Sequence, residues 1–180
     1  FDNLLKFIEL ITHEDGLQIS QRNITVSTCG IVPNMYQLAD RKLQITLALS
    51  LHAPNDEVRK TLMPIANAFP LCDVMTACDY YFEKTGRRMT FEYSLVSGVN
   101  DNEEEAKALS ALIGHRNCHI NLIPVNPIKE RNIVNFKKLL EKNGINVTIR
   151  REMGRDIDGA CGQLRKRYLD RKGDEQRAGM

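Results

Sequence analysis

The sequence has 180 residues, of which 42% are hydrophobic and 27% charged, and a formal net charge of +2 at pH 7. This composition is typical of one globular domain and excludes a disordered chain. No apolar run approaches the roughly 18 residues that cross a bilayer, and the small net charge does not by itself indicate a nucleic-acid-binding protein.

Helices and strands are predicted to alternate along the chain. The sequence opens inside an expected helix at 1–11, so we expect it to be a piece of a longer protein. Apolar segments rich in β-branched residues predict buried strands at 24–28, 45–51, 89–96, 119–125 and 147–151. Apolar spacing, acidic first turns and an Asn-Gly stop predict helices at 34–41, 55–63, 70–84, 102–113 and 130–142.

The alternation predicts an α/β fold with parallel strands joined by crossover helices. The strands read as nearly continuous apolar runs, so we expect helices or barrel packing to cover both faces of the sheet. An open doubly wound sheet and part of a (β/α) barrel both fit this pattern. We expect one domain over residues 1–172 and a disordered tail over 173–180, because the tail has almost no apolar side chains.

Polar or small residues follow the first four predicted strands. In parallel α/β folds the ligand lies at the carboxyl ends of the strands, and hydroxyl, imidazole and carboxamide groups there suit a polar, zwitterionic small molecule. Each residue taken alone is also an ordinary turn former or helix cap. The four segments are 27–30 (STCG), 50–56 (SLHAPND), 97–101 (SGVND) and 124–127 (PVNP).

Two other clusters have simpler explanations than chemistry. His115, Cys118 and His119 lie at the opposite edge of the predicted sheet, and a zinc site needs about four ligands. The glutamates at 103–105 are expected to interact with the dipole of the helix that they begin. The five cysteines are odd in number and lack paired spacing, which favours a reducing cytoplasm over a disulfide scaffold.

Cys161 lies among small residues, in the sequence DGACGQL, after the last predicted strand. Free cysteine is usually a small, buried apolar residue, whereas glycine and alanine neighbours leave a thiol open to a bulky reactant. The residues alone leave both interpretations open. The basic residues between Arg150 and Lys172 fit either phosphate contacts or a solvated tail.

Five motifs, taken together, are more specific than any of these features. They are VSTCGIVP, LALSLHAPNDEVR, FEYSLVSGVND, INLIPVNP and RREMGRDIDGACGQL. Their order and separation closely resemble the C-terminal half of the radical S-adenosylmethionine enzymes that methylate carbon 2 of an adenine in 23S rRNA and in some tRNAs. The resemblance covers residues 1–164 and implies a partial (β/α) barrel of the radical S-adenosylmethionine type, with its N-terminal part missing.

The resemblance also implies site residues. Cys161 corresponds to the cysteine that is S-methylated by one cofactor molecule; a radical made from a second molecule then activates this methyl group for transfer to the adenine. A cysteine elsewhere in the full enzyme forms a disulfide with Cys161 to release the product. A thiolate suits the first step because the electron-poor adenine carbon cannot attack a sulfonium methyl. The positions that correspond to cofactor-binding residues are Ser27, Ser50, Leu51, His52 and Asn126.

The family binds its [4Fe–4S] cluster through a Cys-x-x-x-Cys-x-x-Cys motif, which this sequence lacks. We therefore expect no metal ligand here, interpret Cys29 as a small residue and not a ligand, and expect the fragment to be inactive alone. The resemblance implies a cytoplasmic enzyme with 23S rRNA and tRNA substrates, an electron donor such as flavodoxin, and no membrane association. The alternatives are a related resistance enzyme that methylates carbon 8 and a basic RNA-binding module without catalysis.

Overall fold

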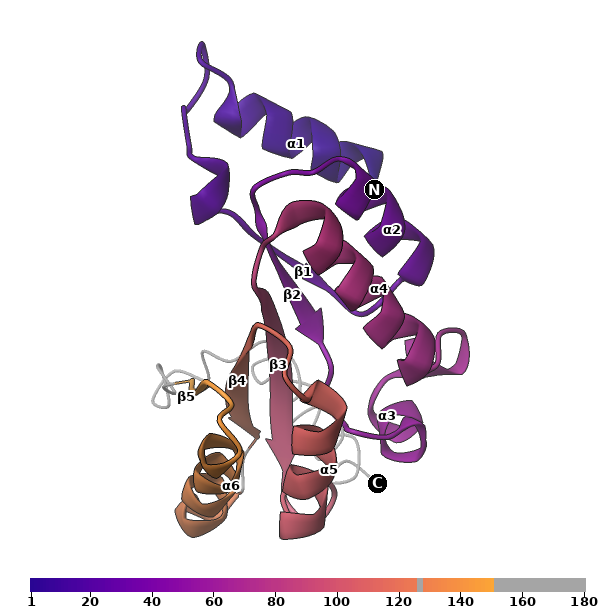
Figure 1. Cartoon of the computed structure of the whole chain (residues 1–180), viewed down its shortest axis with the longest axis vertical. Coiled ribbons are helices and arrows are strands. Elements are labelled where there is room, and N and C mark those ends of the chain that lie inside the picture. Colours follow the sequence, from indigo (N-terminus) through magenta and orange to yellow (C-terminus); the bar gives the residue numbers. More distant parts are fainter. Residues whose placement is uncertain (126–127, 151–180) are drawn as a thin grey trace, which may run out of the picture. The chain divides into compact units, whose positions relative to one another are not determined.

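The computed structural model describes residues 1–125 and 128–150. Within them, Phe1–Ile149 forms a compact unit in which strands and helices alternate (Figure 1). The strands are β1 Thr25–Thr28, β2 Thr46–Ser50, β3 Met89–Val96, β4 Cys118–Val125 and β5 Val147–Ile149. The helices are α1 Asp2–Thr12, α2 Val32–Asp40, α3 Asp56–Leu62, α4 Leu71–Thr85, α5 Glu103–Ile113 and α6 Glu130–Lys142, with short 3-10 helices at Gln21–Asn23 and Pro64–Asn67. The expected domain over 1–172 and tail over 173–180 extend beyond the described residues and stay predictions.

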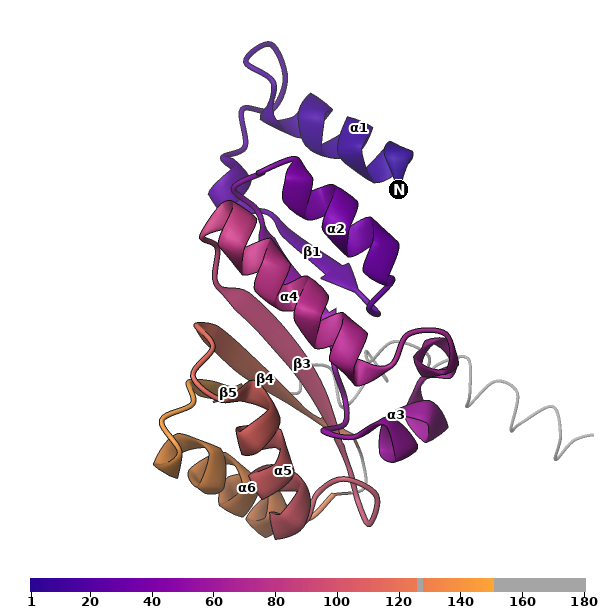
Figure 2. The same ribbon diagram turned by 45° about the vertical axis from the view of Figure 1, so that its right-hand side comes forward.

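The strands of this unit lie side by side in the order in which they occur in the chain. The order is β1-β2-β3-β4-β5, and each neighbouring pair is parallel. Crossovers of one hand between consecutive strands place the connecting helices on one side of the sheet, and Figure 2 shows α2, α4, α5 and α6 on the same side. A doubly wound sheet reverses its strand order at a switch point. The observed order therefore confirms the partial (β/α) barrel.

The two faces of the sheet differ in polarity. Along β3, Phe91 and Tyr93 are fully buried against the helices, whereas Glu92 and Ser94, which alternate with them, are only half-buried. Burial alternates in the same way along most of β4. In the described residues the helices cover only one face, and every second residue of β3 points to the other face, where the side chains are half-buried and several are polar. Barrel packing over this second face stays a prediction. The face opposite the helices is the open face of the sheet.

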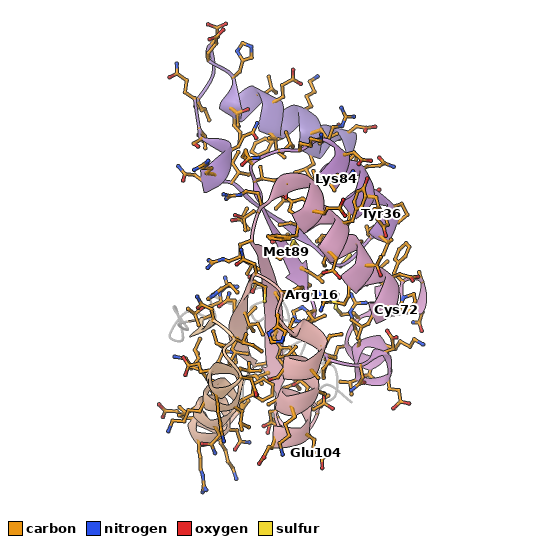
Figure 3. All side chains as sticks on the ribbon, viewed as in Figure 1. Tyr36, Cys72, Lys84, Met89, Glu104 and Arg116 are labelled. Atoms are coloured by element: carbon orange, nitrogen blue, oxygen red, sulfur yellow. The ribbon has the colours of Figure 1, made fainter. Side chains whose placement is uncertain are left out.

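Side-chain contacts fix the helices against one another. Tyr36 of α2 and Tyr80 of α4 pack edge to face with ring centroids 5.0 Å apart, and Lys84 Nζ lies 4.9 Å from the centre of the Tyr80 ring. Figure 3 labels Tyr36 and Lys84 on these two neighbouring helices. Arg116, which follows α5, donates to both carboxylate oxygens of Asp79 in α4, at 2.6 and 2.8 Å. These contacts join α2, α4 and the end of α5 in one layer.

Helix boundaries follow the capping residues in the sequence. The Asn55 and Asn102 side chains accept hydrogen bonds from Val58 N and Glu105 N, at 2.8 and 2.9 Å, and so begin α3 and α5. The glutamates at 103–105 form the first turn of α5, as expected from the helix dipole. Gly86 ends α4 in the left-handed conformation that glycine adopts without strain.

Among the described residues, no helix is long and apolar enough to span a membrane.

Candidate functional site

Ser27 and Ser50 lie on the open face of the sheet, near the carboxyl ends of β1 and β2. In the register, Ser27 is opposite Ala48, and Ser50 follows two residues later on the same face of β2. The Ser27 side chain is exposed and the Ser50 side chain is half-buried. The fold thus brings two hydroxyls predicted for the site to neighbouring strands at one edge.

Leu51 does not offer its side chain to a ligand. Its side chain is 0% exposed and belongs to the core beneath the helices. Its amide donates to the Glu92 carbonyl at 3.0 Å, and its own carbonyl accepts from Arg59 Nε at 3.3 Å. Leu51 therefore anchors the turn between β2 and α3 while the residues beside it face the site.

His52 is held in a left-handed conformation, with a φ of 61°. Its amide donates to the Glu92 carbonyl at 3.2 Å, and its Nδ1 accepts from the Ser94 amide at 3.0 Å. Its carbonyl accepts from Asn100 Nδ2 at 2.8 Å. Burial, and then the positive charge of Arg59, lower the pKa of His52 from 6.5 to about 4. The ring is therefore neutral at neutral pH.

Arg59 is a fully buried arginine that joins the loops after β1 and β2. Its side chain is 0% exposed, and burial lowers its pKa. The guanidinium donates to three carbonyl oxygens: Nε to Leu51 at 3.3 Å, Nη1 to Phe69 at 3.3 Å and Nη2 to Cys29 at 2.9 Å. Because these carbonyls come from three separate loops, Arg59 fixes the distance between the two strand ends that carry the predicted site.

Gly30 makes room for this guanidinium. A Cβ at Gly30 would lie 3.1 Å from Arg59 Nη2, and its φ of +94° is strained for any other residue. The Thr28 hydroxyl accepts a hydrogen bond from the Gly30 amide at 3.1 Å and fixes the same turn. The loop after β1 is therefore shaped by a glycine and a buried arginine acting together.

A row of polar side chains continues across the open face. Ser50 pairs in register with Glu92, Glu92 with Asn121, and Asn121 with Thr148. Asn121 Nδ2 donates to Glu92 Oε2 at 3.0 Å, and His119 Nε2 lies 2.8 Å from Thr148 Oγ1. Within the ranges that the structure describes, no salt bridge engages Glu92. The row gives the open face a polar surface with one carboxylate, that of Glu92.

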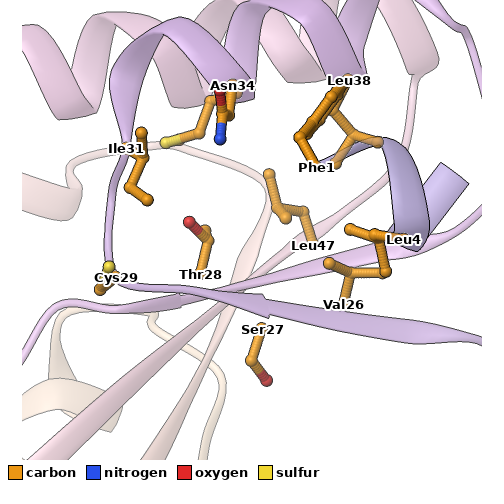
Figure 4. Close-up of a pocket in the computed structure, with 11 residues that line it drawn as sticks. Phe1, Leu4, Val26, Ser27, Thr28, Cys29, Ile31, Asn34, Leu38 and Leu47 are labelled. Carbon is orange, nitrogen blue, oxygen red and sulfur yellow. The ribbon is translucent and has the colours of Figure 1, made fainter.

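An apolar cavity of about 260 Å³ lies on the other side of β1. Its lining includes Phe1, Leu4, Val26 and Leu47, and it lies between the strand and the helices α1 and α2. In Figure 4 the Ser27 side chain points away from the apolar residues of this cavity. The cavity therefore lies on the helix side of the sheet, although Ser27, Thr28 and Cys29 at the end of β1 also border it.

The described cysteines are not arranged to hold a metal. Cys118 is buried in the core, whereas His119, the next residue, points to the open face. Burial raises the pKa of Cys78 to about 12 and that of Cys118 to about 11, so both thiols stay protonated. Cys29 and Cys72 are also free. Residues 1–125 and 128–150 contain no group of three or more His, Cys, Asp or Glu that could hold a metal ion.

Two predicted site residues lie outside the described residues. Asn126 follows β4 directly, and Cys161 follows β5 by several residues. Their assignments stay predictions, as does the disulfide expected for Cys161.

Sequence reasoning missed Arg59, because an arginine next to Lys60 in a short polar helix is typical of a solvent-exposed face.

Known proteins share both the sequence and the fold. No family model matches the chain. It is 67% identical over 178 residues to a probable dual-specificity RNA methyltransferase RlmN of Lachnospira eligens, and this match covers 94% of the chain and 51% of the relative. A protein of the same name from Lachnoclostridium phytofermentans is 65% identical over 179 residues, covering 95% of the chain and 50% of the relative. The chain thus spans about half the length of these curated relatives.

A solved structure agrees with these matches. A radical SAM methyltransferase from Sphaerobacter thermophilus superposes with a TM-score of 0.86 at 40% identity, covering 91% of this chain and 50% of the other. A domain of a pyruvate-formate lyase-activating enzyme from Bacteroides vulgatus shares the fold at 18% identity, with a TM-score of 0.57, over 71% of this chain and 80% of that domain. Over nearly its whole length, the chain therefore resembles one half of the proteins named as RNA methyltransferases RlmN and one half of a radical SAM methyltransferase.

Proposed function

We propose that the chain forms the cofactor-binding and methyl-carrying half of an RNA methyltransferase that modifies carbon 2 of an adenine in 23S rRNA and in tRNA. One observation carries the proposal. Within a region 67% identical to a relative named as a dual-specificity RNA methyltransferase, Ser27, Ser50 and His52 lie together at the carboxyl ends of neighbouring strands.

The edge of the sheet fits S-adenosylmethionine in its chemistry. The cofactor is zwitterionic and carries ribose hydroxyls and an adenine, all of which need hydrogen-bonding partners. The hydroxyls of Ser27 and Ser50, the imidazole of His52 and the polar row beyond them supply such partners on an open face. Arg59 keeps the two strand ends at a fixed distance, so the site is largely formed before the cofactor binds.

The described cysteines do not fit a [4Fe–4S] cluster. Such a cluster needs several thiolates close together, whereas Cys78 and Cys118 are buried thiols with raised pKa values. Cys72 is exposed on α4 and Cys29 follows β1. We therefore assign the cluster to the half of the relatives that the match with this chain does not cover.

The role proposed for Cys161 is that of a methyl acceptor. Bound S-adenosylmethionine supplies an electrophilic methyl group on its sulfonium. The Cys161 thiolate attacks this methyl carbon, a new carbon–sulfur bond forms, and the bond to the sulfonium breaks, so that S-adenosylhomocysteine leaves. The adenine carbon cannot perform this displacement itself, which is why a thiolate carrier is required.

The relatives are named as probable dual-specificity RNA methyltransferases, which supports an RNA substrate. Carbon 2 as the methylated atom, and 23S rRNA and tRNA as the substrates, are proposed from the motifs in the sequence. An electron donor such as flavodoxin would serve the full enzyme in the cytoplasm. A carbon 8 methyltransferase and an RNA-binding module without turnover are the competing functions, and the product distinguishes all three.

The test is the product made by the full-length enzyme and by its C161A variant. Both are expressed in a bacterial host that lacks its own enzyme of this kind, and the adenosines of 23S rRNA and tRNA are separated by liquid chromatography and mass spectrometry. We expect 2-methyladenosine from the parent and none from C161A, with C72A as the control that keeps full activity. An 8-methyladenosine product would favour the resistance class, and unmodified RNA from the parent would favour the binding module.

A further inference from the structure

The His52 side chain extends the hydrogen bonding between β2 and β3 beyond the end of their ladder. The ladder between β2 and β3 ends at the pair of Ser50 and Glu92, and the Glu92 carbonyl then accepts from the amides of both Leu51 and His52, at 3.0 and 3.2 Å. The next amide of β3 on the side of β2 is that of Ser94, and it has no partner in β2 because the ladder has already ended. It donates instead to His52 Nδ1 at 3.0 Å, so the imidazole occupies the place of a ladder partner.

This bond determines which ring nitrogen of His52 carries the proton. A backbone amide only donates, so Nδ1 must present its lone pair to Ser94 and cannot hold a proton at the same time. In the neutral ring the proton is then on Nε2. Within the described part of the chain, no hydrogen bond engages this Nε2, which leaves Nε2–H as the donor that the ring offers to a ligand.

Asn100 holds the same residue from the backbone side. Its side chain is 0% exposed, and its Nδ2 donates to the carbonyls of His52 and Ser94, at 2.8 and 2.7 Å. Its Oδ1 accepts from the Val96 amide at 2.7 Å, and its own carbonyl accepts from the Tyr93 hydroxyl at 3.1 Å. Each polar atom of this buried side chain is therefore used to tie the end of β3 to His52.

The left-handed backbone of His52 needs such support. A φ of 61° is uncommon for a residue other than glycine and persists where surrounding contacts over-determine it. Hydrogen bonds from Ser94 and Asn100 supply these contacts, and the amide of His52 adds its own bond to Glu92. The turn therefore keeps the ring in one orientation without a ligand.

We propose that Asn100 is a positioning residue of the S-adenosylmethionine site, which holds His52 so that its Nε2–H is the donor offered to an acceptor atom of the cofactor. This inference rests on the proposed function. It adds a defined tautomer, a direction of hydrogen bonding and a residue that acts through His52 without touching the cofactor.

The experiment combines histidine ¹⁵N NMR with calorimetric titration of S-adenosylmethionine into the full-length protein. The His52 signal is assigned by its loss in H52N. The parent is expected to show a protonated Nε2 and an unprotonated Nδ1. In N100D the carboxylate still accepts from Val96 N but cannot donate to His52, so we expect a mixture of tautomers and about tenfold weaker binding.

H52N is the variant that tests the donor with the least risk to the fold. Asparagine tolerates the left-handed conformation and its Oδ1 can accept from Ser94 N, but it places no donor where Nε2–H lies. We expect it to fold like the parent and to bind about tenfold more weakly. The matched control is N102A, which loses the cap of α5 two residues beyond Asn100 and should keep both the tautomer and the affinity.

Three results would overturn the inference: a proton on Nδ1 in the parent, undiminished affinity in both N100D and H52N, or the same loss in N102A. Failure of the proposed function looks different. If the parent protein has the predicted tautomer but binds no S-adenosylmethionine, the hydrogen bonds that hold His52 are confirmed. The cofactor site proposed at the carboxyl ends of β1 and β2 is then refuted.

Discussion

Replacing Arg59 by methionine removes the group that joins the loops after β1 and β2. The Cys29, Leu51 and Phe69 carbonyls would lose their guanidinium donors at 2.9, 3.3 and 3.3 Å. Each carbonyl left unpaired in a buried site costs about 1–3 kcal/mol, and removal of a buried charge offsets part of this. We expect R59M to lower the free energy of unfolding by about 3 kcal/mol.

The assay is equilibrium unfolding in urea, followed by circular dichroism. R59K should lose less, about 1–2 kcal/mol, because an ammonium can still donate to one or two of the carbonyls. K60M changes the exposed neighbour in the same helix and should stay within about 0.5 kcal/mol of the parent. If R59M is as stable as K60M, the guanidinium does not hold the loops together and the reasoning is wrong.

Two further predictions concern the same turns. G30A should lose about 2 kcal/mol more than G86A in urea unfolding, because both have positive φ but only the Gly30 Cβ would meet Arg59 Nη2, at 3.1 Å; equal losses would contradict the close approach. Because the pKa of His52 falls from 6.5 to about 4 on folding, the unfolded chain binds the additional proton. Stability should therefore rise with pH between about 4 and 6.5, by up to about 3 kcal/mol. The H52N variant should lack this component, so parallel stability profiles of parent and variant between these pH values would refute it.

The fold could be predicted from local chemistry. Caps such as Asn102, the stop at Asn143-Gly144 and the β-branched strands set the element boundaries to within about two residues, because these signals act over a single turn. The alternation of strands and helices did not determine the strand order, because an open doubly wound sheet and part of a (β/α) barrel both fit it; the resemblance to a known family favoured the barrel. The open polar face was missed because the apolar residues of β3 were interpreted as a run, although Glu92 and Ser94 alternate with them.

The site was only partly predictable. Ser27 and Ser50 lie near the ends of their strands and His52 follows β2, so the parallel topology brings all three to the same end of the sheet. Asn100 also follows a strand, in the segment 97–101, but its burial and its contact with His52 could not be predicted, and Arg59 has no such signal. Both depend on three-dimensional contacts with carbonyls far away in the sequence. Arginine and asparagine are usually exposed, and nothing in their spacing contradicts that expectation.

The central claim is that S-adenosylmethionine binds at the carboxyl ends of β1 and β2. The most direct measurement is the change in backbone amide NMR signals when S-adenosylmethionine is added to the full-length protein. We predict the largest changes at Ser27, Ser50 and His52. Changes confined to the apolar cavity behind β1, around Leu4 and Leu47, would contradict the account.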